Sequence, residues 1–93
     1  MNWDGLPGAD LIEAGLVDLA ERRETDAALL VSIGRPRLRG LGIDVPDPLP
    51  LDRSPEHQLY LRLARSGSDS AHSRYNALVR RLVSFERAAG CVR

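Results

Sequence analysis

Residues 43 to 55, IDVPDPLPLDRSP, carry prolines at positions 46, 48, 50 and 55. Each proline lacks a backbone N–H, and each disfavours the helical conformation in the residue before it. This stretch therefore cannot form a continuous helix, and we expect it to run extended over the surface. It divides the chain into an N-terminal helical half, residues 9–42, and a C-terminal helical hairpin, residues 56–90.

The first half begins with a predicted helix over residues 9–23. Apolar side chains at Ile12, Leu16 and Leu19 recur at helical spacing and would share one face. Arg22 and Arg23 would then lie in the last turn, where positive charge stabilises the helix dipole.

A second, shorter helix is predicted over residues 26–33. Thr25 is a good N-cap for it, and Gly34 is expected to end it. In the RPRLRGLG that follows, Pro36 favours one more turn of helix that ends at Gly40 or Gly42.

The C-terminal half is predicted to contain two helices. Ser54 as N-cap and Pro55 at the first helical position start the first of them, and Gly67 is expected to end it. The second would cover residues 71–89 and stop at Gly90. Its apolar stripe consists of Tyr75, Leu78, Val79, Leu82, Val83 and Phe85.

These elements predict an all-α fold, because no stretch alternates apolar and polar residues between hairpin turns. We expect residues 1–93 to form a single domain, a small bundle of four helices with a fifth short turn, in two halves joined by the proline-rich connection. None of the predicted helices looks apolar all round, so each should share its stripe with the others.

Composition excludes several classes of protein. No apolar run approaches the roughly 20 residues needed to cross a bilayer, and the start of the chain lacks the basic and apolar regions of a signal peptide. We therefore expect a cytoplasmic protein that does not bind membranes. Cys91 is the only cysteine, which excludes an internal disulfide and a cysteine-cluster metal site.

The net charge is zero, but the two halves differ in sign. Residues 1–33 hold seven acids and two arginines, a balance of −5, whereas residues 34–93 hold eleven arginines and six acids, a balance of +5. Such asymmetry indicates either an anionic partner for the basic half or two halves that neutralise each other. The zero total favours the second interpretation.

Arg35, Arg37 and Arg39 alternate in a segment flanked by glycines, IGRPRLRGLG, residues 33–42. Guanidinium and backbone groups in such a segment can approach a phosphate. The segment matches no phosphate-binding fingerprint, however. We expect a connector whose arginines are solvated or pair with acids of the first half, with a phosphate or protein contact as the alternative.

The last predicted helix has a basic face opposite its apolar stripe, formed by Arg74, Arg80, Arg81, Ser84 and Arg87. Such a face either meets water, paired with Glu86 and acids of the first half, or follows a phosphate backbone. A pI of about 6.7 speaks against a dedicated nucleic-acid binder.

No catalytic or metal-binding constellation is evident, so we predict no enzyme, no cofactor and no metal. Glu56, His57, Asp69 and His72 are the residues that would have to meet to form a metal site, and two histidines without a cluster of ligands make a poor one. Trp3, in a glycine-rich leader, is expected to anchor the N-terminus across the first helix, or else to contact a partner.

The leading hypothesis is a small protein–protein interaction module, either a homodimer or the companion of another protein, because a short aliphatic core gains stability by burying surface against a second chain. Its size is that of a small bacterial regulator or an antitoxin-type inhibitor. The alternative is an arginine-mediated nucleic-acid-binding protein.

Overall fold

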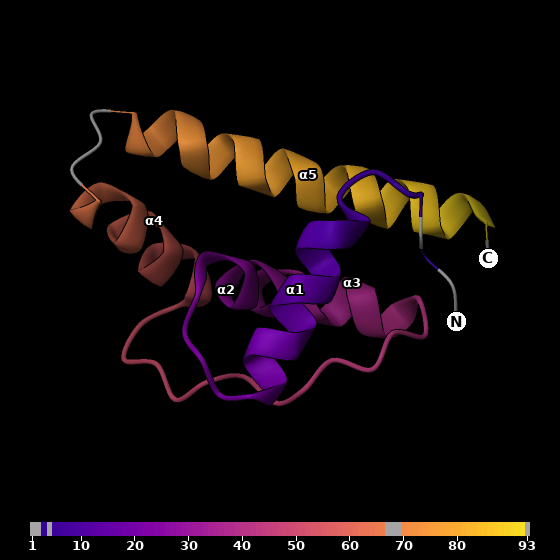
Figure 1. The fold of residues 1–93 in the computed structure, drawn as a ribbon, viewed down its shortest axis with the longest axis horizontal. Coiled ribbons are helices and arrows are strands. Elements are labelled where there is room, and N and C mark those ends of the chain that lie inside the picture. The colour runs from indigo at the N-terminus through magenta and orange to yellow at the C-terminus, as the bar shows by residue number, and fades with distance from the viewer. Residues whose placement is uncertain (1–2, 4, 67–69, 93) are drawn as a thin grey trace.

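The computed structural model describes residues 3, 5–66 and 70–92, and within them it has five helices and no strand (Figure 1). The helices are α1 (Ala9–Ala20), α2 (Asp26–Ile33), α3 (Arg35–Gly40), α4 (Pro55–Arg65) and α5 (Ala71–Val92). The all-α prediction is confirmed, and the predicted short turn is the helix α3.

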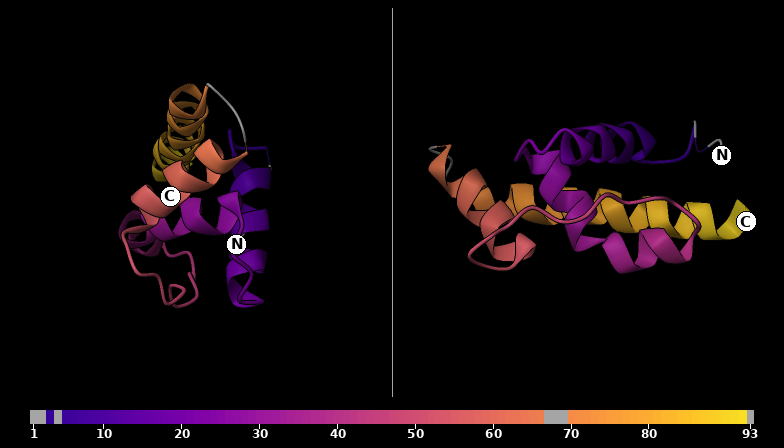
Figure 2. Two further views of the ribbon diagram at one scale, coloured as in Figure 1. Left: turned by 90° about the vertical axis from the view of Figure 1, so that its left-hand side faces the viewer. Right: turned by 90° about the horizontal axis from the view of Figure 1, so that it is seen from below.

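Helix α2 lies at the centre and packs against each of the other four helices (Figures 1 and 2). Helices α4 and α5 pack on each other as the predicted hairpin. At about 1.5 Å per residue, the 22 residues of α5 span most of the longest dimension of the molecule, 38 Å. The segment between α3 and α4 passes along the side opposite α5 (Figure 1).

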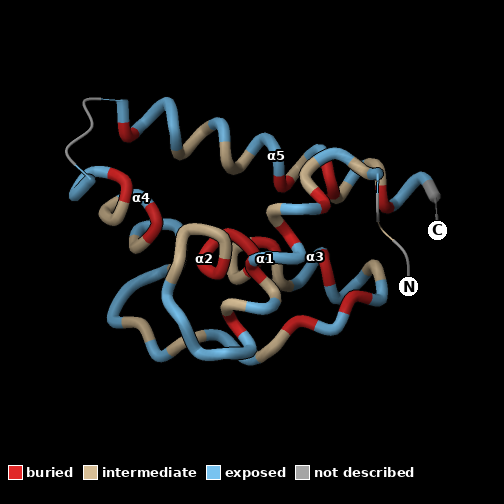
Figure 3. Tube along the Cα trace, in the orientation of Figure 1, coloured by how far each residue is buried: buried red, intermediate tan, exposed pale blue. Residues whose placement is uncertain are grey.

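The core is built around α2. Its residues Ala28, Leu29, Leu30 and Val31 are all 0% exposed, as the buried colour of this helix in Figure 3 shows. Four consecutive helical residues point in directions about 100° apart, so this turn has no side that faces solvent. Helix α2 as a whole is not apolar all round, since it includes Asp26 and Ser32, but its central turn is buried on every side. The remaining large buried side chains are Ile12, Leu19, Leu38, Leu59, Leu63, Leu82 and Phe85.

Helices α1 and α2 approach each other closely at Gly15. A Cβ atom at this position would lie 2.7 Å from Val31 Cγ1 and 2.8 Å from the carbonyl carbon of Ala27, closer than atoms can pack. The missing side chain thus lets the backbone of α2 lie directly against α1. Sequence periodicity alone gave no sign of this contact.

The predicted caps of two helices are confirmed. The Thr25 hydroxyl accepts a hydrogen bond from the Ala28 N–H at 3.0 Å, and the Ser54 hydroxyl accepts one from the His57 N–H at 3.2 Å. Helix α2 ends at Ile33 as predicted, and Gly34 serves both as its C-cap and as the N-cap of α3.

The prediction that the first helix extends to residue 23 is wrong, since α1 ends at Ala20. Arg22 adopts a left-handed conformation with φ of 60°. Its guanidinium donates hydrogen bonds to the carbonyl oxygens of Asp47 and Pro48 at 2.8 and 3.2 Å. The helix therefore stops where Arg22 turns to hold the proline-rich segment.

The proline-rich segment is free of regular secondary structure as predicted, but it does not lie wholly on the surface. Ile43 and Val45 are 7% and 5% exposed and belong to the core. These two side chains and the bonds from Arg22 fix the segment against the helices.

The last helix passes through Gly90, which was expected to stop it, and continues to Val92. A glycine inside a helix costs only about 1 kcal/mol, and the preceding Ala89 is fully buried. The packing at the end of α5 therefore outweighs the tendency of Gly90 to stop the helix. The predicted stop at Gly67 lies outside the described residues. None of the described helices combines the length and apolar character required to cross a bilayer.

Leu82 is 3% exposed, whereas Leu78, predicted to face the interior equally, is only partly buried. We expect Leu82→Ala to lower the free energy of unfolding by about 2–5 kcal/mol and Leu78→Ala to lower it by less. Urea unfolding of both variants measures this. Equal losses, or an unchanged midpoint for Leu82→Ala, would contradict the placement of the core face of α5.

Alanine normally stabilises a helix relative to glycine, but at Gly15 it would collide with the backbone of α2. We expect Gly15→Ala to destabilise the fold by about 1–3 kcal/mol, the usual range for overpacking. Gly90→Ala is the matched control, because a Cβ there would meet only Leu41 Cδ2 at 3.9 Å, an ordinary contact. It should be neutral or raise the melting temperature. Two variants with the same melting temperature would show that α1 and α2 can separate without cost.

Candidate functional site

The arginines at positions 35, 37 and 39 lie on helix α3 rather than on a loop. Arg35 pairs with Asp47 at 3.5 Å, and Arg37 pairs with Glu86 at 3.4 Å. Arg39 is exposed and has no ion pair among the described residues. In the described residues the two paired arginines do not meet acids of residues 1–33, because both acids come from later in the chain, whereas exposed Arg39 agrees with the other expectation, a solvated side chain.

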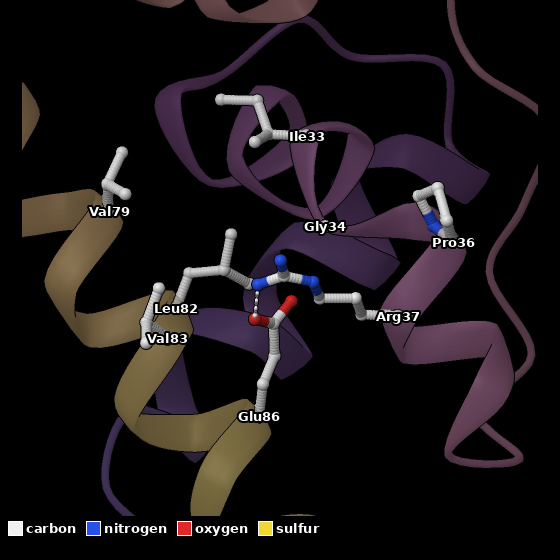
Figure 4. A pocket seen from close by; sticks show the side chains of 8 residues that line it. All are labelled: Ile33, Gly34, Pro36, Arg37, Val79, Leu82, Val83 and Glu86. Atoms are coloured by element: carbon white, nitrogen blue, oxygen red, sulfur yellow. Dashed lines mark hydrogen bonds and ion pairs between the residues drawn. The ribbon is translucent and has the colours of Figure 1, made fainter.

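The pair between Arg37 and Glu86 crosses a surface groove between the α2–α3 junction and α5 (Figure 4). The groove has a volume of about 280 Å³. We call it the α3–α5 groove. It is lined by Ile33, Gly34, Pro36, Arg37, Val79, Leu82, Val83 and Glu86.

The walls of the groove are mainly aliphatic. Ile33, Val79 and Val83 are each only partly buried, and they come from the end of α2 and the middle of α5. Pro36 adds an exposed apolar ring from α3. Apolar side chains from three helices are thus left beside one another and in contact with water.

Glu86 is the one carboxylate among these apolar walls, and its side chain is only 9% exposed. Its Oε1 accepts the bond from Arg37, whereas its Oε2 is buried and has no hydrogen-bond partner among the described residues. The guanidinium side of the pair is 75% exposed. A buried carboxylate oxygen that lacks a donor costs free energy, so the groove holds an unused acceptor.

Glycine at position 34 makes room for this carboxylate. A Cβ there would lie 3.0 Å from Glu86 Oε2 and 2.8 Å from Leu82 Cδ1. The absence of a side chain thus lets the carboxylate lie at the base of the groove beside the backbone of the α2–α3 junction.

The predicted basic face of α5 is exposed at Arg74, Arg80, Arg81 and Arg87. Arg81 pairs with Asp10 at 3.1 Å, and Arg74 donates a hydrogen bond to the Ser66 hydroxyl at 2.8 Å. Arg80 and Arg87 make no hydrogen bond or ion pair within the described part of the chain. Among the arginines of this face, these two are the ones without a polar partner in the described ranges.

Ion pairs join the acidic residues 1–33 to the basic residues 34–93. Arg62 on α4 pairs with Asp26 at 3.0 Å and with Glu24 at 3.4 Å. The pair between Arg81 and Asp10 makes the same kind of connection between α5 and α1. These pairs support the interpretation that the two halves neutralise each other within one fold.

Both histidines are exposed, and no group of three or more potential metal ligands occurs in the described ranges. Asp69, named with them as a possible ligand, lies outside those ranges. His72 instead lies beside Tyr60, which also contacts Tyr75, with ring centroids 6.5 and 6.0 Å apart. Burial, and then the negative charge of Glu56, raise the pKa of Tyr75.

Trp3 does anchor the N-terminal leader, but on a different helix from the one predicted. Its ring packs edge-on against Phe85 of α5, with the centroids 5.9 Å apart. Gly8, with φ of 77°, turns the leader at this place, and a Cβ there would lie 2.9 Å from the Arg81 carbonyl oxygen. Trp3 is half-buried in this contact and is not part of the α3–α5 groove.

Of the residues predicted to contact a partner, the structure brings only Arg37 into the groove, and the sequence reasoning missed Glu86 as a site residue. A signal for Glu86 was present. It is the only acid between residues 71 and 93, and it follows Leu82 by four residues and Val79 by seven, which places it on the apolar stripe.

Comparison with known protein families, with curated proteins and with solved structures yields no match to this chain.

Removal of Arg37 would leave the Glu86 carboxylate without its cation. We expect Arg37→Gln to lower the free energy of unfolding by about 1 kcal/mol, since one partner of the pair is buried and the other largely exposed. Arg39→Gln, on the same short helix, should change it by less than about 0.5 kcal/mol. Thermal unfolding compares the two, and equal effects would mean that the pair across the groove does not hold α3 to α5.

Proposed function

We propose that the protein is a small cytoplasmic protein–protein interaction module whose α3–α5 groove holds a segment of another protein or of a second copy. One observation carries the proposal: Ile33 of α2 and Val79 and Val83 of α5 line a hollow that remains open to water. Grouped apolar side chains that stay exposed are typical of binding surfaces.

The open form of the groove favours a protein segment over a small-molecule ligand. Ligand pockets usually bury most of the ligand, whereas this groove, of about 280 Å³, is open to water. It is suited to one or two side chains of a partner, in the way that a central residue of an interface fills a pocket.

A chain of 93 residues also gains stability from a partner, because a small domain buries a smaller share of its surface than a large one. The proposed role is non-catalytic. It is consistent with a regulator or an antitoxin-type companion that acts by binding another chain.

The structure gives less support to the nucleic-acid alternative. Arg35, Arg37 and Arg81 are all paired with acids of the same chain, and the net charge is zero. Phosphate would have to be held mainly by the exposed arginines without a hydrogen-bond or ion-pair partner in the described ranges, which are Arg39, Arg53, Arg65, Arg80 and Arg87. They are spread over α3, the proline-rich segment, α4 and α5, so no single element offers more than two of them for phosphate contacts.

The proposal predicts that a charge in the groove blocks binding. We expect peptides selected from a displayed library on the wild-type protein to lose tenfold or more in affinity for Val83→Glu, because the new carboxylate must be desolvated against aliphatic walls. Val17→Glu is the matched control: Val17 is 53% exposed on α1, away from the groove. It should leave affinity unchanged. Circular dichroism checks that both variants fold.

Three further results bear on the proposal. Light scattering after size-exclusion chromatography shows whether a second copy is the partner, in which case Val83→Glu should dissociate the dimer. Selected peptides that bind Val83→Glu as well as wild type would exclude the groove as the site. Micromolar binding of random DNA or RNA at physiological salt, lost when Arg39, Arg80 and Arg87 become Gln, would favour the nucleic-acid alternative.

A further inference from the structure

We infer that the α3–α5 groove selects a partner segment that presents a lysine, whose ammonium group donates a hydrogen bond to Glu86 Oε2. This inference rests on the proposed function and narrows the partner to another protein, because this chain contains no lysine and a second copy could not supply one. Its basis is a carboxylate that is more than nine-tenths buried at the base of an apolar groove, with one oxygen that has no donor in the described structure.

The free acceptor is best matched by a cation. Glu86 is a carboxylate surrounded by Leu82, Val83 and the α2–α3 junction, so little water can solvate its charge. Hydrogen bonds from a charged donor to a carboxylate are about twice as strong as those between neutral groups. A partner that supplies one such donor would remove the free-energy cost of the unpaired carboxylate oxygen. The same bond would add both affinity and specificity.

The geometry favours lysine over arginine. Arginine binds a carboxylate most strongly when it contacts both oxygens, but Oε1 of Glu86 already accepts the bond from Arg37. Only one oxygen remains, and an ammonium group needs only one. The four methylene groups of a lysine would lie along Ile33, Val79 and Val83, since such stems bury well against aliphatic surfaces.

Arg37 is the residue that competes with the incoming lysine. Two cations on one carboxylate repel each other, and the bond from Arg37 Nη1 to Glu86 Oε1 is long, at 3.4 Å. Oε2 is covered in the free protein, and because the Arg37 side chain is 75% exposed, it can shift aside to uncover this oxygen while it keeps its bond to Oε1. Removal of Arg37 should therefore strengthen binding even though it weakens the fold.

The test uses peptides from a displayed random library selected on the wild-type protein and filtered for loss of binding to Val83→Glu. We expect lysine to be enriched in them. In a synthetic peptide, replacing that lysine with norleucine, which keeps the apolar stem, should weaken binding about tenfold or more. Replacement with arginine should also weaken it. Isothermal titration calorimetry measures all three peptides.

Protein variants assign the effect to the carboxylate. With Glu86→Gln, the difference between the lysine and norleucine peptides should fall below about twofold, whereas Glu13→Gln, an exposed glutamate on α1, should leave it unchanged. Arg37→Gln should bind the lysine peptide more tightly than wild type does. If Glu86→Gln does not fold, the peptide series on wild type and on Arg37→Gln still decides the matter.

The failures of the two proposals can be told apart. Peptides that need Val83 but show no preference for lysine, or a preference that persists in Glu86→Gln, would overturn the inference and leave the proposed function standing. A library that yields no peptide dependent on Val83, with a protein that is monomeric, would overturn both.

Discussion

Helix α2 is buried around its whole circumference at residues 28–31, so other parts of the chain must cover every side of it. A helix of eight residues is not stable alone in water, and its stability comes from these contacts. The closest contact is with α1, where Gly15 allows backbone to meet backbone. The rest of the architecture follows from this burial, including the way the proline-rich segment places Ile43 and Val45 in the core after α3.

Local sequence signals were reliable wherever a feature depends on neighbouring residues. Thr25 and Ser54 cap the helices that they were predicted to cap, because a cap needs only a side-chain oxygen and an N–H three residues on. These signals failed where contacts with residues distant in sequence determine the backbone conformation. The conformation of Arg22 depends on carbonyl groups 25 and 26 residues away, and the helix continues past Gly90 because of packing that the local sequence does not reveal.

The candidate site was predictable only in part. The arginines of residues 35 to 39 stood out by composition, but their roles depend on which acids the fold brings to them, and these were Asp47 and Glu86 instead of the acids of the first half. Periodicity places Glu86 on the apolar stripe of α5. Whether a lone acid at such a position lies under a neighbouring helix or at an open groove depends on the docking of α3, which no local pattern encodes.

The close contact at Gly15 also limits how related sequences can diverge from this one. Most core positions tolerate exchange among aliphatic residues of similar volume, so chains that diverge from this one can lose nearly all overall similarity and keep the fold. Position 15 has no such freedom, since even one methyl group meets the backbone of the central helix. A glycine in the middle of an amphipathic helix, twelve residues before an alanine in the first turn of a short apolar helix, should therefore mark distant descendants of the fold after other resemblance has gone.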